Sequence, residues 1–408
     1  MSTLRDIANI MDNVAPALDL RSLQNQHRFA PADDQSLRAI CQRHSNPNKL
    51  EQRLLFFNAF LMDAGIIASK PAVNDRARRL GEKIRDNFDI ALLCEIFEKN
   101  VLKKVLKAWD KENPPEVKDD AQDSTANSSG LAILSQQKNM GGTNFHEYEN
   151  EMGSDAWAEK GIILTKAYIG LGNSLLELYV THLNADGAPA RRLQLLELAK
   201  FIEDNHDSNN VAIVAGDFNV NSLSLVRSRV IHMFGSLGGG GKDSDSEEEI
   251  DYGRFDNFII DVINNRYPKG ITEFEMLNEL FTELGFTDMW TTRNGTPGYT
   301  SHMDVNGIAN QICRPDAINN NLCDDINVPA TLADFDSNFT NDDDNTANSG
   351  RLDYMFINQP NNNHTFSLDF TRPRRTRFER RADAPERDCL AFLSDHLGLT
   401  TRLIMAPR

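Results

Sequence analysis

The chain has few cysteines and no long apolar run. Its five cysteines are dispersed over 408 residues without a Cys-x-x-Cys pair, which argues against a disulfide framework and against a zinc site. Cys313 and Cys323 flank an irregular loop and are expected to be free thiols outside an oxidising compartment. No stretch of about 18 apolar residues occurs, and the first residues lack the apolar core of a signal peptide. The sequence therefore predicts a soluble protein, either cytoplasmic or exported without a Sec signal.

Positive charge is also scarce. The chain has 43 Lys and Arg residues against 60 Asp and Glu residues, a formal net charge of -17. Because phosphate contacts supply most of the affinity for nucleic acids, this balance disfavours a long polyanion as a partner. A local basic cluster opposes this trend and consists of Arg372, Arg374, Arg375, Arg377, Arg380 and Arg381.

Short apolar runs alternate with amphipathic segments along the chain. Apolar residues recur every three or four positions in the segments where we expect helices, and strands are expected at short β-rich runs. Too many strands follow one another without helices for a purely parallel sheet, so we expect an α/β sandwich of two mixed sheets covered by helices. Helices are predicted at 74–87, 190–204 and 272–285, and strands at 54–62, 90–94, 129–135, 161–170, 175–182, 211–215, 285–290, 351–358 and after residue 396.

Composition divides the chain into an extension and one large domain. Residues 1–50 are predicted to form a polar, helical N-terminal extension, and 51–408 the domain that carries the chemistry. Four consecutive glycines beside an acidic run predict a mobile loop at 235–251. An Asn- and Asp-rich insertion at 304–349 lacks the spacing of an EF-hand and is predicted to be a solvated loop. A polar, glycine-containing loop is expected between 136 and 156.

The stretch VAIVAGDFN, residues 211–219, is the centre of the prediction. Its first five residues form an apolar run typical of a strand buried on both faces, which Gly216 is expected to break. Asp217 and Asn219 follow two positions apart, so their side chains point the same way if the backbone stays extended. Such a pair can hold a divalent cation and a phosphate oxygen, whereas the alternative is an ordinary turn at the end of a strand.

Other polar residues also stand within or at the end of apolar runs. One such residue is usually a solvated cap, but burial of many would cost free energy unless they are paired or coordinate a cation. Carboxylate and amide oxygens suit magnesium and phosphoester hydrolysis. Of two histidines, one can hold a phosphate oxygen while the other takes a proton from water. The full set is Asn58, Glu95, His182, Asp217, Asn219, Asp353, Asp395 and His396.

The order of the local motifs resembles a known superfamily. FFNAF, LLCEIFE, SGLAILS, THLNAD, GDFNVN, LDYMFIN and LSDHLGL follow one another as in the endonuclease/exonuclease/phosphatase superfamily. This resemblance implies the four-layer α-β-β-α sandwich of deoxyribonuclease I. KGIILTKAYIG and RRLQLLELAKFI look most like the neutral sphingomyelinase and phospholipase C-like branch.

The resemblance implies a metal site and two residues on the substrate side. Glu95 would be the principal magnesium ligand, with Asn58 beside it and Asp395 completing the site. The site would hold one or two divalent cations, with Mn²⁺ or Ca²⁺ as alternatives to Mg²⁺. Lys160 and Arg191 would lie on the substrate side, although a solvated strand end and a helix start explain them equally well.

The resemblance also implies the catalytic roles. His182 would donate a hydrogen bond to the scissile phosphate, and Asp217 and Asn219 would position the attacking water and the phosphate. His396 would be the general base, oriented by Asp353.

Three functions are compatible with this reading. The first is a magnesium-dependent phosphodiesterase, sphingomyelinase- or phospholipase C-like, acting on a lipid head group or a small molecule. The second is a deoxyribonuclease-like endonuclease or exonuclease, favoured by the arginine cluster and opposed by the net charge. The third is a non-catalytic binding module on the same fold.

Overall fold

The computed structural model describes residues 50–61, 73–110, 112–120, 128–149, 159–168, 175–185, 188–221, 272–294, 300–302, 349–359, 366–376, 394 and 396–407. The predicted extension before residue 50, the loop at 235–251 and the insertion up to 348 lie outside these residues. Asp395, Cys313 and Cys323 also lie outside them.

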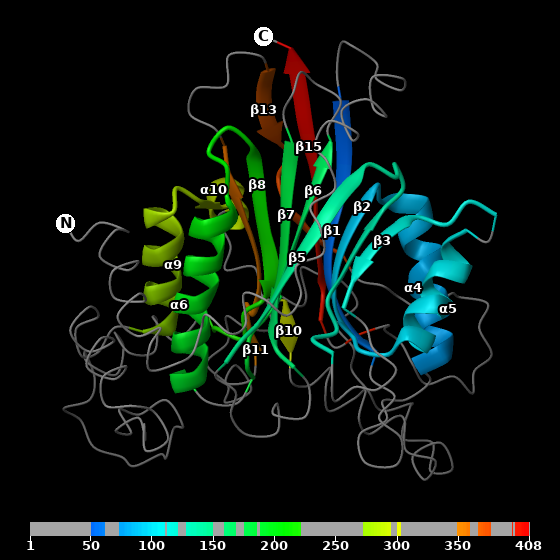
Figure 1. The fold of residues 1–408 in the computed structure, drawn as a ribbon, viewed down its shortest axis with the longest axis horizontal. Helices are drawn as coiled ribbons and strands as arrows, with labels where there is room; N and C mark the ends of the chain where they lie inside the picture. The colour runs from blue at the N-terminus through cyan, green and yellow to red at the C-terminus, as the bar shows by residue number, and fades with distance from the viewer. Residues whose placement is uncertain are drawn as a thin grey trace.

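Two β-sheets form the centre of the protein (Figure 1). The first sheet has seven strands in the order β13-β15-β1-β2-β4-β3, with β14 also paired to β15. β1 and β2 are parallel, whereas β1 and β15 are antiparallel. The strands are β1 (Leu50–Leu61), β2 (Ile90–Ile96), β3 (Glu116–Asp119), β4 (Ala132–Ser135), β13 (Phe366–Phe370), β14 (Arg374–Thr376) and β15 (Gly398–Pro407).

The second sheet has six strands in the order β5-β6-β7-β8-β12-β9. β7 and β8 are parallel, and β12 runs antiparallel to β8. A separate two-stranded pair joins β10 (Ser301–His302) and β11 (Ser349–Gly350). The six strands are β5 (Met140–Glu147), β6 (Gly161–Tyr168), β7 (Leu175–His182), β8 (Val211–Asp217), β9 (Thr287–Asp288) and β12 (Asp353–Asn358).

Helices cover the outer face of each sheet (Figure 1). The pair α4 (Val73–Asn87) and α5 (Lys99–Trp109) packs on the seven-stranded sheet. The pair α6 (Ala188–Asn205) and α9 (Glu273–Glu283) packs on the six-stranded sheet. The predicted four-layer α-β-β-α sandwich of two mixed sheets is therefore confirmed. No helix in the described parts of the chain is both long and apolar enough to cross a membrane.

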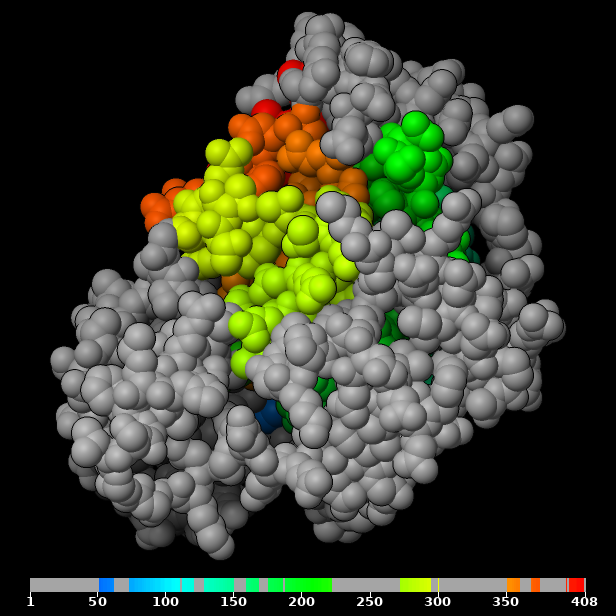
Figure 2. Space-filling view, turned by 90° about the vertical axis from the view of Figure 1, so that its left-hand side faces the viewer, coloured from blue at the N-terminus to red at the C-terminus, as the bar shows by residue number. Residues whose placement is uncertain are grey.

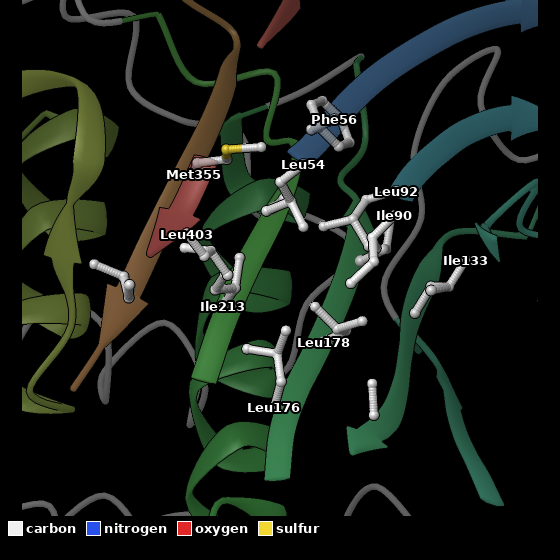
Figure 3. Packing of buried hydrophobic residues seen from close by; sticks show 14 of the residues in the cluster. Leu54, Phe56, Ile90, Leu92, Ile133, Leu176, Leu178, Ile213, Met355 and Leu403 are labelled. Carbon is white, nitrogen blue, oxygen red and sulfur yellow. The ribbon is translucent and has the colours of Figure 1, made fainter. Parts of the chain in front are cut away.

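Side chains of the central strands point alternately to the other sheet and to the helices, which explains why the sequences of these strands are continuous apolar runs. In β1, Leu54 and Phe56 face the second sheet, while Leu55 and Phe57 face the helices. Successive side chains of a strand point to opposite faces, so a strand buried on both faces needs apolar residues at every position. Figure 3 shows the resulting core between the sheets, where residues from β1, β2, β4, β7, β8, β12 and β15 meet.

The strand predicted over 285–290 is wrong at both of its ends. Only Thr287–Asp288 pairs, as β9, and α10 (Met289–Arg293) begins directly after it. The cause is Asp288, whose carboxylate accepts the backbone N–H of Trp290 at 2.9 Å and caps the helix. Figure 2 shows α9 and α10 on the surface beside the segment that contains β13, to which Arg293 is tied by an ion pair with Asp369.

The loop predicted between 136 and 156 contains a strand. Met140–Glu147 forms β5 at the edge of the six-stranded sheet and pairs with β6. Only its first two residues are buried, so its sequence needs little apolar character and reads as a polar loop.

Candidate active site

The polar residues gather at one end of the space between the sheets. In β7, β8 and β12, alternation places His182, Asp217 and Asp353 on the face that carries the inter-sheet core. Strand register brings these three side chains together, because Asp217 pairs with His182 on one side and with Asp353 on the other. All three side chains are buried. The site continues the core at its polar end, which lies at the bottom of Figure 1, where β10 and β11 are drawn.

The sequence predicted that Gly216 breaks the strand. This prediction is wrong, because β8 continues through Gly216 to Asp217. A Cβ atom on Gly216 would lie 2.5 Å from the backbone oxygen of Thr181 in β7. The glycine therefore allows close approach of the two strands immediately beside the pair of His182 and Asp217.

Asn58 links the two sheets at this point. Its Nδ2 lies 2.8 Å from Oε1 of Glu95 in the same sheet and 2.9 Å from Oδ2 of Asp217 in the other. Its Oδ1 accepts the backbone N–H of Phe60 at 3.0 Å. The predicted metal ligand thus stands between two carboxylates with its amide nitrogen toward both of them.

A left-handed backbone turns Glu95 into the site. Cys94 belongs to the core between the sheets, whereas Ile96, two residues later, belongs to the core beneath the helices. Regular alternation would place them on the same face, and the φ angle of 58° at Glu95 accounts for the reversal. Such a conformation costs a non-glycine residue on the order of 1–3 kcal/mol and persists where the surroundings hold it.

His182 lies among groups of both charges. Its Nε2 is 3.9 Å from both Glu95 Oε1 and Asp217 Oδ2, and the Lys160 ammonium lies 3.1 Å from the same nitrogen. Burial lowers the pKa of His182 well below its usual value, and the charges of Lys160 and His396 lower it further. The imidazole is therefore neutral at pH 7.

His396 forms a hydrogen-bonded pair with Asp353. Its Nδ1 lies 2.8 Å from Asp353 Oδ2, and its Nε2 lies 3.7 Å from Asp217 Oδ2, beyond hydrogen-bonding distance. With the proton on Nδ1, as this network assigns it, Nε2 is the basic nitrogen of the ring. Sequence reasoning missed Thr300, whose hydroxyl accepts the backbone N–H of Asp353 at 3.1 Å and whose carbonyl accepts that of Leu397 at 2.8 Å. No local pattern around Thr300 signals this role.

The donor atoms fit a divalent cation. Two groups have all their donor atoms within 4.8 Å of one another, namely Glu95, His182 and Asp217, and Asp217, Asp353 and His396. Burial raises the pKa of the Asp217 carboxyl to about 7; the proximity of His396 opposes this rise and the charge of Asp353 adds to it. Among the described residues, Asp353 Oδ1 is buried without a hydrogen-bond partner. Closely spaced buried carboxylates of this kind are stabilised by a hard cation that shares their charge.

Asn219 and Arg191 occupy supporting positions. Asn219, with a φ angle of 51°, donates its backbone N–H to Asp217 Oδ1 and its side-chain Nδ2 to the carbonyl of Leu183, both at 2.9 Å. The guanidinium of Arg191 binds both oxygens of Glu273 in α9, at 2.8 and 2.9 Å, and the carbonyl of Ala185 at 2.7 Å. The structure thus brings together the predicted residues Asn58, Glu95, Lys160, His182, Asp217, Asn219, Asp353 and His396, and places Arg191 behind the loop that follows His182.

The order of the layers and the position of the site define a protein with the deoxyribonuclease I-like fold. The sequence profile of the endonuclease/exonuclease/phosphatase family matches residues 55–396, and the chain belongs to this family. The family resemblance predicted from the motifs is thereby confirmed.

Comparison with solved structures gives distant similarities, and no curated protein matches the chain. Beta toxin of Staphylococcus aureus is 14% identical, with a TM-score of 0.48 over 86% of this chain and 99% of the toxin. D. rerio TDP2 carrying 14 humanising mutations is 13% identical, with a TM-score of 0.46 over 86% and 98% of the two chains. Sphingomyelinase C of Streptomyces griseocarneus is 12% identical, with a TM-score of 0.44 over 88% and 99%.

Proposed function

We propose that this protein is a magnesium-dependent phosphodiesterase that activates water through His396. The observation that carries the proposal is the hydrogen bond of 2.8 Å between His396 and Asp353, next to the acidic group around Asp217. A histidine whose Nδ1 proton is held by a buried carboxylate, so that Nε2 is the basic nitrogen, is the arrangement that a general base requires.

The proton transfer is assigned to His396 Nε2. This nitrogen takes a proton from the attacking water, while the Nδ1 proton stays on the ring and is held by Asp353. The negative charge of Asp353 stabilises the imidazolium that results. The hydroxide oxygen bonds to phosphorus and the bond to the leaving oxygen breaks. The leaving oxygen takes a proton from solvent, and the His396 imidazolium gives its Nε2 proton back to solvent.

Glu95 and Asp217 would hold the cation, with Asp395 as a further ligand outside the described residues. When bound, Mg²⁺ supplies positive charge against the charge that develops on the phosphate and lowers the pKa of coordinated water. Asn58 keeps the two carboxylates in register through hydrogen bonds from its Nδ2 to both. Asn219 orients Asp217 through a hydrogen bond to Oδ1.

His182 and Lys160 would bind the phosphate. A neutral imidazole can donate one N–H to a phosphate oxygen without carrying a charge into the site. The Lys160 ammonium, 3.1 Å from the His182 ring and buried, supplies the positive charge beside it. For Arg191 we propose a positioning role in place of a substrate contact, because Glu273 and main-chain carbonyls occupy its guanidinium.

The substrate class that we propose is a small or lipid-like phosphodiester. The net charge of -17 repels long polyanions, whereas one diester group needs only the local positive charge of the site. A panel of bis-p-nitrophenyl phosphate, sphingomyelin, phosphoinositides and plasmid DNA, each with Mg²⁺ and with chelator, tests the substrate class and the metal requirement. We expect chelator-sensitive hydrolysis of a small or lipid diester; turnover that persists in chelator would contradict the metal, and no turnover of any compound would contradict the reaction.

A nuclease is the second candidate, favoured by the position of β14. This strand pairs with the start of β15, two residues after His396, and carries the exposed Arg374, with the exposed Arg372 just before it. Arginines at this edge of the sheet could hold the phosphates of a nucleic acid strand next to the site. Cleavage of plasmid DNA in the same panel, in preference to the small diesters, would select this candidate.

A further inference from the structure

The carboxyl end of β1, which carries Asn58, has an irregular backbone. The register between β1 and β2 shifts between Asn58 and Leu61. Phe60, within this shift, has a φ angle of 51°, in the left-handed region that an aromatic residue rarely adopts. Such a conformation persists only where neighbouring groups hold it, so contacts to the Phe60 peptide must determine the local structure.

Arg76 of α4 supplies one of these contacts. Its guanidinium donates to the carbonyl of Phe60 at 2.7 Å and to that of Ala59 at 3.5 Å. It also lies 5.6 Å from the centroid of the Phe60 ring, within the range of a cation–π interaction. Arg76 is only 2% exposed, so these interactions take place out of water.

The backbone of Phe60 is thus held at both its N–H and its carbonyl. Arg76 binds its carbonyl, and the Oδ1 of Asn58 accepts its N–H at 3.0 Å. This N–H selects the orientation of the Asn58 amide, because the oxygen must face the donor. Nδ2 then faces Glu95 and Asp217, to which it donates at 2.8 and 2.9 Å. With the amide rotated, its oxygen would face both carboxylates and would repel them.

We propose that Arg76 is a positioning residue for the cation site and acts through Phe60 and Asn58. Arg76 fixes the left-handed turn, the turn fixes the Asn58 amide, and the amide sets the spacing of the two carboxylates that would hold the cation. This inference deepens the proposed function and rests on it. A residue outside the ligand set that orients ligands in this way contributes about 10- to 100-fold to metal affinity.

The alternative is that Arg76 serves only to attach α4 to the sheet. A double-mutant cycle with Asn58→Ala separates the two roles, because residues that act through one another show non-additive effects. Arg79→Met is the matched control: Arg79 lies one turn along α4 and forms an ion pair of 2.7 Å with Asp75 of the same helix.

The test measures Mg²⁺ binding to the full chain by calorimetry without substrate, and unfolding by urea, for Arg76→Met, Arg76→Lys, Asn58→Ala and the double variants. We expect Arg76→Met to weaken Mg²⁺ binding about 10- to 100-fold, Arg76→Lys to restore part of it, and Arg79→Met to leave it unchanged. In the Asn58→Ala background, the effect of Arg76→Met on Mg²⁺ binding should disappear.

Two results would overturn the inference. The first is a folded Arg76→Met protein with wild-type Mg²⁺ affinity. The second is an equal loss of Mg²⁺ affinity on Arg76→Met in the wild-type and the Asn58→Ala backgrounds. If Arg76→Met does not fold, the double-mutant cycle of Arg76→Lys with Asn58→Ala replaces it, and equal losses of Mg²⁺ affinity in the two backgrounds would again overturn the inference. A wild-type protein that binds Mg²⁺ but hydrolyses no diester would reject the proposed function alone. The Mg²⁺ affinities of the Arg76 variants would still test the positioning role of Arg76. A wild-type protein that binds no Mg²⁺ would reject both.

Discussion

The carboxyl of Asp217 makes stability depend on pH in the direction opposite to that of a paired surface carboxylate. Burial raises its pKa to about 7, from a usual value of 3.8. Between these values the native state holds a proton that the unfolded state has lost, so the free energy of unfolding falls as pH rises. The slope is at most about 1.4 kcal/mol per pH unit for one group.

Urea unfolding of the metal-free protein in chelator, between pH 4 and pH 8, measures this effect. Comparison with Asp217→Asn cancels the contributions of other groups. We expect the stability of the wild type relative to the variant to fall as pH rises from about 4 to about 7, and to be independent of pH above this window. Two stability curves that stay parallel throughout would show that the Asp217 carboxyl is not buried in this way.

The alternation of side-chain direction along the strands determines which site residues could be predicted from the sequence. His182, Asp217 and Asp353 follow the face of their strands, so the sequence places them correctly at the end of the core. The orientation of Asn58 could not be predicted, because it depends on the left-handed backbone at Phe60 and on a donor from α4. Thr300 could not be found either, since its contacts join β12 and the segment before β15, which are distant in sequence.

At the scale of elements, a buried ion pair connects β9 to the start of β12. Arg351 and Asp288 form two hydrogen bonds, at 2.6 and 2.7 Å, and are 1% and 5% exposed in their side chains. Replacing Asp288 with Asn keeps the shape but leaves the guanidinium charge buried and uncompensated. We expect a loss of about 3–5 kcal/mol in the free energy of unfolding, measured by urea denaturation.

The matched control is Asp369→Asn, which removes a partner of Arg293 in an exposed pair. Its cost should be below about 1 kcal/mol, because water screens the pair. Equal costs for the two substitutions would contradict the view that burial of the Arg351 charge determines the difference.

Helices α6 and α9 together hold the loop that follows β7. Glu273 of α9 binds Arg191 of α6, which binds the carbonyls of Asn184 and Ala185. If Arg191 positions this loop, Arg191→Met and Glu273→Gln should lower kcat/KM to a similar extent, up to about 100-fold, because small displacements in a site are costly. Steady-state kinetics on the preferred diester of the substrate panel measures both.

The same pair of variants distinguishes the two roles of Arg191. If Arg191 contacted substrate, Glu273→Gln would free its guanidinium and would preserve or improve KM, whereas Arg191→Met would raise KM. Opposite effects of the two variants would therefore restore the substrate-side role that the sequence motif implies.

Elements with strong apolar patterns could be predicted from sequence, and those without could not. The central strands and α4, α6 and α9 match their predicted positions, because each buries a face that its pattern shows. β5 has little to bury, and β9 is only two residues long, so neither leaves a readable pattern.

At the scale of the whole molecule, the net charge of -17 determines how salt affects each substrate class. Hydrolysis of a small diester should change little between 50 and 200 mM salt, at fixed Mg²⁺, because few counterions are displaced. Cleavage of DNA, where it occurs, should fall steeply over the same range, because each contacted phosphate releases counterions. Rates for bis-p-nitrophenyl phosphate and plasmid DNA in a salt series provide the measurement. DNA cleavage that is fast and insensitive to salt would contradict the account of substrate choice.

The central claim is that His396 is the general base of a hydrolytic site built between the two sheets. The direct measurement is kcat for Mg²⁺-dependent hydrolysis of bis-p-nitrophenyl phosphate by His396→Ala and by the control His146→Ala. His146 also pairs with a carboxylate, Glu197 at 3.2 Å, but it lies on β5 against α6, outside the site. We expect His396→Ala to lose about 10²- to 10⁴-fold in kcat with Mg²⁺ affinity retained, and His146→Ala to keep wild-type activity. Wild-type turnover by a folded His396→Ala protein would contradict the account.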